Sequence, residues 1–88
     1  MTYELQVERR AQRALEAIPA NAYLRLERAI DSLALEPRPR GAKRLRGAAG
    51  LWRIRVGQYR VIYVIFDKER LVKIILVKRR SEDTYEDL

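Results

Sequence analysis

The sequence predicts a small α+β domain in the order β-α-α-β-β-β, with a small antiparallel sheet packed on an N-terminal helix hairpin. Two observations predict this fold. Apolar residues recur at helical spacing within the first 36 residues, and they recur at the spacing of strands from residue 51 onward. The length of 88 residues leaves room for one core, so we expect a single domain over residues 1–88.

The N-terminal half is predicted to hold one short strand and two helices. The strand has alternating apolar residues, which are Tyr3, Leu5 and Val7. A first helix follows, and Pro19 ends it because proline cannot continue a helix. Asn21 is the predicted N-cap of a second helix. The apolar stripe of that helix consists of Tyr23, Leu26, Ile30 and Leu33. Two amphipathic helices joined in this way form a hairpin.

The C-terminal half is predicted to be a run of strands after a basic connection. The connection, EPRPRGAKRLRGAAG at residues 36–50, is broken by proline and glycine, and we expect no regular structure in it. Gly57–Gln58 is typical of a hairpin turn, and residues 67–70 form a second turn. The predicted strands are residues 51–56, 59–66 and 71–77. The middle strand is apolar almost throughout, which indicates a central strand covered on both faces.

Alternation within the first of these strands separates arginines from apolar residues. Arg53 and Arg55 share one side with Leu51, because side chains alternate with period two. We expect the helix hairpin to cover the opposite side, which would hold Trp52, Ile54, Val56, Ile62, Val64 and Phe66. Trp52 and Tyr63 are predicted core residues. The other side of the sheet is therefore predicted to be wet and positive.

Positive charge is concentrated in the middle of the chain. The formal net charge is +7, and no acid lies between Glu36 and Asp67. The cations in this interval are Arg38, Arg40, Lys43, Arg44, Arg46, Arg53, Arg55 and Arg60. A basic patch attracts polyanions, because neutralised phosphates release condensed counterions. A basic face that serves only solubility has the same composition, and the charge alone does not decide between the two.

The residue types that the chain lacks exclude several kinds of chemistry. Without cysteine it has neither a disulfide framework nor a thiolate metal site, and without histidine it lacks the commonest general base. We therefore expect no cofactor and no metal site, and any catalysis must use arginine, lysine, tyrosine, serine or carboxylates. No segment approaches the length of a membrane span, so we expect a cytoplasmic protein with no membrane partner.

Three stretches resemble the signature stretches of the RelE/ParE toxin superfamily, in the same order and at the same distances. They are KRLRG at 43–47, WRIRVGQYRVIYVI at 52–65 and VKRRSEDTY at 77–85. The resemblance covers nearly the whole chain and implies the fold already predicted. In its RelE branch it implies a toxin of a type II toxin–antitoxin system, a metal-independent, ribosome-dependent mRNA endonuclease that inhibits translation. The implied partners are a cognate antitoxin, the ribosome and mRNA.

The resemblance also implies which residues act. The family's working residues are a basic pair two apart on a strand, an arginine on the next strand, an arginine after the last strand and a tyrosine six residues beyond it. Here the implied catalytic residues are Arg53, Arg55, Arg60, Arg79 and Tyr85. The expected RNA-binding residues, outside the chemistry, are Lys43, Arg44, Arg46 and Lys78. Arg80 is predicted to point away from Arg79, and we leave it outside the site.

The implied reaction is attack of a ribose 2′-OH on the adjacent phosphate. Guanidinium groups suit the charged phosphorane, since a planar fork meets two phosphate oxygens, but arginine cannot act as the general base. Family members carry lysine at the paired strand positions, where this chain has Arg53 and Arg55, so the identity of the base is open. Tyr85 is a candidate base, because nearby cations favour the phenolate, and it is equally a candidate platform for base stacking.

Three other functions fit parts of the pattern. A ParE-like toxin keeps this fold and poisons DNA gyrase, but it usually lacks the basic strand pair and the terminal arginine and tyrosine. A non-catalytic nucleic-acid-binding module would need the basic patch and not Tyr85. A degenerate toxin would still bind its antitoxin. In a purely structural alternative, Arg53 and Arg55 pair with acids of the C-terminal tail, which are Glu82, Asp83, Glu86 and Asp87.

Overall fold

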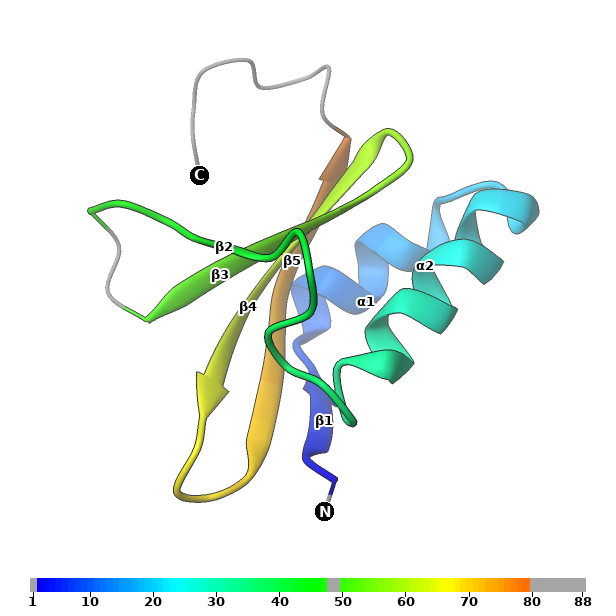
Figure 1. The fold of residues 1–88 in the computed structure, drawn as a ribbon. Helices are drawn as coiled ribbons and strands as arrows, with labels where there is room; N and C mark the ends of the chain where they lie inside the picture. Colours follow the sequence, from blue (N-terminus) through cyan, green and yellow to red (C-terminus); the bar gives the residue numbers. More distant parts are fainter. Residues whose placement is uncertain (1, 48–49, 80–88) are drawn as a thin grey trace.

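The computed structural model describes residues 2–47 and 50–79, which form two helices and a five-stranded sheet (Figure 1). The elements are β1 (Glu4–Val7), α1 (Arg9–Glu16), α2 (Ala20–Ser32), β2 (Lys43–Arg44), β3 (Leu51–Val56), β4 (Tyr59–Phe66) and β5 (Leu71–Arg79). The strand order is β1-β5-β4-β3-β2, and both helices lie on one side of the sheet. The α+β class is confirmed, and so is the predicted order of one strand, two helices and a run of strands, to which the structure adds the short strand β2. No helix in the described part has the length and apolar character needed to cross a membrane.

The sheet is mixed, whereas the sequence predicted an antiparallel one. β3, β4 and β5 form an antiparallel meander, but β1 pairs with β5 in parallel, with Glu4 opposite Leu71 and Val7 opposite Ile74. A parallel pair needs a long crossover between its strands. Here the helix hairpin and the first strands of the meander supply that crossover. Alternation within β1 gives its buried face but not its direction, so the sequence pattern left this pairing undetermined.

Two local predictions in the first half of the chain were wrong. The basic connection contains a short strand, β2, whose Lys43 and Arg44 pair with Arg53 and Trp52 of β3. Two residues are too few to show alternation, which is why no strand was predicted there. Asn21 is not the N-cap of α2, because Pro19 occupies that position and its carbonyl accepts the hydrogen bond from the Tyr23 amide at 2.9 Å.

The β3–β4 hairpin sets which residues face the helices. Its two-residue turn places Val56 opposite Tyr59. Each even-numbered residue of β3 therefore lies opposite an odd-numbered residue of β4, and the two side chains of such a pair point to the same face of the sheet. Trp52, Ile54 and Val56 face the helices as predicted, and their partners on β4 are Tyr63, Val61 and Tyr59. Ile62, Val64 and Phe66 were predicted on that face, and this prediction was wrong: they lie on the side away from the helices.

The core lies between the helix hairpin and the sheet. Its fully buried members include Ala11 of α1, Leu26 of α2 and Tyr63 of β4, each 0% exposed. The Tyr63 hydroxyl donates a hydrogen bond to the Pro37 carbonyl oxygen at 2.7 Å, and burial raises the pKa of Tyr63 to about 12. Trp52 is half-buried against this cluster. The prediction of Tyr63 as a core residue is confirmed, and Trp52 packs on the same core.

A polar cluster ties the N-terminus, the basic connection and the β4–β5 turn together. Arg38 donates to both carboxylate oxygens of Asp67, at 3.3 and 2.8 Å, and the Tyr3 hydroxyl donates to Asp67 Oδ1 at 2.7 Å. The Arg38 guanidinium carbon also lies 5.3 Å from the centroid of the Trp52 ring. The hydrogen bonds from Arg38, and then from Tyr3, lower the pKa of Asp67.

We expect Asp67→Asn to lower the free energy of unfolding at neutral pH and to flatten its decline in acid. The folded-state pKa of Asp67 lies below its value in the unfolded chain, which is about 4. The carboxylate therefore stabilises the fold fully above the unfolded-state pKa, and this contribution is lost as pH falls through the folded-state pKa. Urea unfolding across this pH range measures the effect. Glu69→Gln, in the same turn, is the control, and identical pH profiles for the two variants would contradict the prediction.

Candidate nucleic-acid interface

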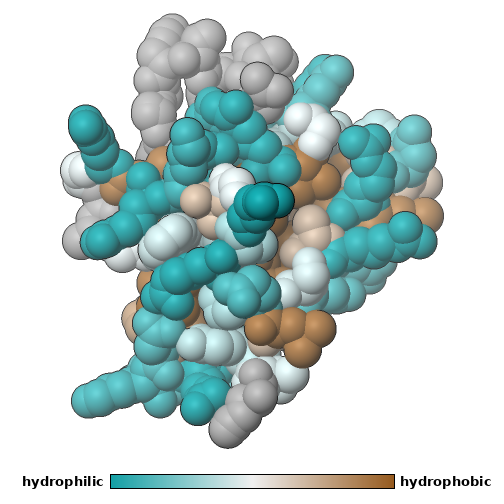
Figure 2. All heavy atoms as spheres, in the orientation of Figure 1, coloured by the Kyte–Doolittle hydropathy of each residue, from teal (hydrophilic) through white to brown (hydrophobic). Residues whose placement is uncertain are grey.

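Five cations from four neighbouring strands share the side of the sheet that faces away from the helices. Cross-strand pairing joins Lys43 to Arg53, Arg55 to Arg60 and Arg60 to Lys78. Directly opposite residues lie on one face of a sheet, and so do residues two apart on one strand. We call this set the arginine face; it consists of Lys43, Arg53, Arg55, Arg60 and Lys78. Figure 2 shows hydrophilic side chains over the strands on the visible side of the molecule.

Arg53 is held in the sheet surface. It is 8% exposed, and it is the one charged residue classed as buried among the described residues. Its neighbours across the sheet are Lys43 on β2 and the buried Ile62 on β4. Ile62 lies on this side because of the hairpin register, so it forms an apolar floor beside the guanidinium. A charge shielded from water in this way interacts more strongly with a bound anion than an exposed one does.

Arg55 and Arg60 are like charges placed directly opposite each other. Arg55 is exposed and Arg60 is half-buried. Like charges at directly opposite positions destabilise a sheet, by up to about 1 kcal/mol. A phosphate bound across the two strands would lie within reach of both side chains, so the pair is a candidate anion site.

A hollow of about 270 Å³ opens beside the arginine face. It is lined by Arg40, Gly41, Lys43, Arg53, Ile54 and Arg55. Gly41 has a φ of +94°, a left-handed conformation that favours glycine and turns the connection toward β2. Arg40 therefore joins the cations around the hollow. It was not among the predicted site residues, although its place in the acid-free run of the sequence was a signal for it.

The structure does not bring Arg79 together with the arginine face. Arg79 pairs with Tyr59 at the end of β5, on the helix side, and its Nη2 donates to Gln58 Oε1 at 3.2 Å. The cause is a bulge in β5: Ile62 pairs with Leu76 and Tyr63 with Ile74, which leaves Ile75 between them without a partner strand residue. Because of this extra residue, every side chain of β5 after Ile75 points to the side of the sheet opposite to the one that an uninterrupted strand would give it.

The same bulge brings Lys78 next to Arg60. An uninterrupted register would instead have placed Arg79 on the arginine face. Lys78 was predicted to bind RNA outside the chemistry, and the structure places it directly opposite Arg60, one of the predicted catalytic residues.

The other predicted residues lie at the periphery or outside the described residues. Arg44 is exposed at the sheet edge opposite Trp52, and Arg46 is exposed just after β2. Tyr85 lies outside the described residues, as does Arg80. In the described part of the chain, no three potential metal-ligating side chains come together.

Comparison with known proteins gives consistent relatives. The family model described as the ParE toxin of type II toxin–antitoxin systems matches residues 5–84. A Methanocaldococcus jannaschii protein that bears the name RelE1 is 28% identical over 84 residues, covering 92% of this chain and 93% of that protein.

Two solved structures are more similar in sequence. A chain of the archaeal RelE–RelB complex from Pyrococcus horikoshii is 34% identical, with a TM-score of 0.82, and the match covers 93% of this chain and 99% of that one. A chain of the toxin–antitoxin complex RelBE2 from Mycobacterium tuberculosis is 30% identical, with a TM-score of 0.81, covering 91% and 100%. Both similarities extend over the helices and the sheet alike.

Proposed function

Because this chain belongs to the RelE/ParE superfamily of type II toxin–antitoxin toxins, in its RelE-like branch, we propose that it is an endoribonuclease that cuts mRNA on the ribosome and thereby inhibits translation. The reaction we propose is attack of a ribose 2′-OH on the adjacent phosphate, without a metal ion or cofactor. The proposed place of action is the cytoplasm, where ribosomes and mRNA are found.

The arginine face carries this proposal. Arg53, Arg55 and Arg60 occupy adjacent positions on two strands, next to a hollow of about 270 Å³. Attack by the 2′-OH produces a phosphorane with one more negative charge than the starting phosphodiester. Guanidinium groups fixed on a rigid sheet can meet that extra charge with paired hydrogen bonds. Strand pairing sets the backbone positions of all three arginines before the substrate arrives, and burial restricts the Arg53 side chain, which limits the reorganisation needed as the charge develops.

Proton transfer requires a group other than these arginines. Arginine stays protonated under physiological conditions, so it can neither accept the 2′-OH proton nor release one to the leaving 5′-oxygen. The resemblance to the family gives Tyr85 as the candidate. Strand pairing puts the amine of Lys78 on the same face as Arg60, directly opposite it, and we include Lys78 in the proposed site. We propose that Arg79, which the resemblance implied to be catalytic, instead binds RNA at the end of the β3–β4 hairpin, where its guanidinium contacts Gln58 on the helix side of the sheet.

We further propose that a cognate antitoxin binds this toxin. Two of the similar structures are of toxins in complex with their antitoxins. A positive face with an apolar floor fits an acidic, amphipathic segment, which would cover the arginines and block access of RNA. Such an interface would weaken as salt concentration rises, because exposed charges are screened.

A translation reaction reconstituted from purified components tests the main proposal. We expect the purified protein to stop synthesis from a defined mRNA, and primer extension on that mRNA to locate new ends within ribosome-bound codons. The control reaction omits ribosomes and should leave the mRNA intact. Unaffected synthesis with intact mRNA would refute the proposal. Inhibited synthesis with intact mRNA would instead support a binding protein that does not cleave.

A further inference from the structure

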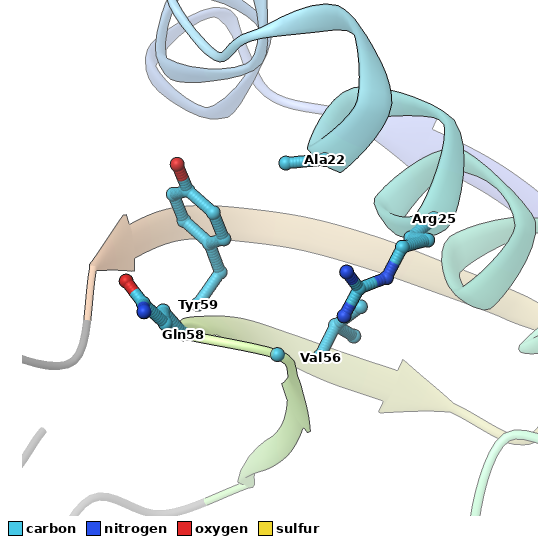
Figure 3. A pocket seen from close by; sticks show the side chains of 6 residues that line it. Ala22, Arg25, Val56, Gln58 and Tyr59 are labelled. Carbon is cyan, nitrogen blue, oxygen red and sulfur yellow. The ribbon is translucent and has the colours of Figure 1, made fainter.

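A second pocket lies on the reverse of the β3–β4 hairpin, between that hairpin and α2. Its volume is about 290 Å³, and it is lined by Ala22, Arg25, Val56, Gly57, Gln58 and Tyr59. Figure 3 shows Arg25 reaching down from α2 toward the hairpin and Tyr59 rising from the hairpin toward α2. The pocket is on the helix side of the sheet, and none of the site residues predicted from the sequence lines it.

Two guanidinium groups contact the hairpin turn at this pocket. Arg25 lies against Gly57 so closely that a Cβ added at Gly57 would be 2.7 Å from Arg25 Nη2. Arg79 donates its hydrogen bond to Gln58, the next residue of the turn. Among the described residues, no carboxylate forms an ion pair with Arg25 or Arg79. Both cations therefore gather at one two-residue turn without an acidic partner in that part of the chain.

The pocket and the arginine face lie on opposite sides of the same end of the β3–β4 hairpin. Arg55 and Arg60 form the last residue pair on one face, and Val56 and Tyr59 form the next pair, on the other face. Between them lies only the turn, where Gly57 has no side chain and Gln58 is exposed. A polyanion that leaves the arginine face across this turn meets Arg25, which lies against Gly57, and Arg79, which is bonded to Gln58, so that cations lie on both sides of the turn.

The remaining walls suit the planar part of a nucleotide. Tyr59 is half-buried and offers an aromatic ring, while Val56 and Ala22 add apolar surface. Splayed bases of single-stranded RNA stack on aromatic side chains, and their phosphates bind guanidinium groups. The volume lies near the lower end for ligand pockets, which is about 300 Å³, so it fits one nucleotide and not a larger group.

We infer that this pocket is a second subsite for single-stranded RNA, which takes a nucleotide beyond the cleaved step, with its phosphate between Arg25 and Arg79 and its base against Tyr59. The inference rests on the proposed function, since it extends the RNA path of that site. RNA is favoured over an acidic protein segment because Tyr59 offers an aromatic ring to a base beside the cations that would bind its phosphate.

RNA length provides the test. Binding is measured by fluorescence anisotropy with two RNAs. One is a trinucleotide, and the other is a longer RNA of about ten nucleotides that contains the same three nucleotides. In both, a 2′-deoxy sugar at the step to be cut prevents cleavage. Arg25→Ala is expected to weaken binding of the longer RNA about tenfold, the usual effect of losing one charge-assisted hydrogen bond. Its salt dependence should become shallower by about one phosphate contact. Binding of the trinucleotide should stay unchanged.

The controls separate this inference from its alternatives. Arg28→Ala, on the same helix but outside the pocket, should leave both RNAs bound as before, and Arg25→Lys should recover part of the lost affinity. Thermal unfolding of each variant confirms that it is folded. Equal losses of affinity for the trinucleotide and the longer RNA in Arg25→Ala would overturn the inference. It would also be overturned if Arg25→Ala lost as much affinity for polyglutamate as for the longer RNA, since the pocket would then respond to negative charge alone. Cleavage on ribosomes by the unaltered protein is measured separately, so the proposed function and the subsite can fail independently.

Discussion

Replacing Arg60 by alanine should slow cleavage of ribosome-bound mRNA about 100- to 1,000-fold, which corresponds to about 3–4 kcal/mol of transition-state stabilisation. Arg60 is the centre of the arginine face, with Arg55 opposite it on β3 and Lys78 opposite it on β5. A guanidinium there can meet the charge that develops on the phosphorane. The measurement is the single-turnover cleavage rate at saturating ribosomes, where a loss of binding alone does not change the rate.

Two companion variants distinguish chemistry from binding and from folding. Arg60→Lys keeps the charge but loses the planar fork, and it should recover only part of the rate. Lys43→Ala, at the sheet edge, should weaken RNA binding and its salt dependence, since a flanking phosphate contact contributes equally to ground and transition states. If Arg60→Ala is folded and cleaves at the unaltered rate under saturation, Arg60 does not stabilise the transition state.

The sequence predicted most elements of this fold because the segments with helical or strand-like spacing of apolar residues are long enough for the pattern to be recognised. The α2 stripe and the eight residues of β4 each show a clear pattern, and both elements were found near the expected bounds. β2 has two residues, which is a single period of alternation and too short for the pattern to repeat. The parallel direction of β1 was not predictable for a related reason, since four residues show which side is buried and not how the strand is oriented.

The sequence predicted the candidate site less completely, because a site depends on which face each residue occupies. Period-two alternation placed Arg53 and Arg55 together correctly. Deciding which side chains of β4 share a face with Arg53 and Arg55 requires the exact pairing across the turn. Ile62 was predicted on the opposite face from Arg53, and this prediction was wrong. The apolar side chain beside Arg53 was therefore missed. In β5 the bulge at Ile75 changes the face of every later residue, and nothing in the run of apolar residues around it indicates an extra residue.

The bulge in β5 leads to the last prediction, that Lys78→Ala reduces cleavage more than Arg79→Ala. Lys78 pairs with Arg60 on the arginine face, so its loss should lower the single-turnover rate at saturation about 100-fold. Arg79 contacts Gln58 on the opposite side, next to the pocket of Arg25. Its loss should mainly raise the concentration needed for half-maximal cleavage, because a flanking phosphate contact is equally strong before and during the reaction.

The comparison is matched, because the two cations are adjacent in sequence and lie at the end of one strand, where neither substitution opens the core. Residue 78 is half-buried and residue 79 is exposed, so circular dichroism of both variants should confirm an intact sheet before rates are compared. A larger loss of maximal rate for Arg79→Ala would contradict the prediction. The Arg79 side chain would then have to leave Gln58 and cross the strand end to reach the phosphate, and the register of β5 in the free toxin would not determine which cation acts.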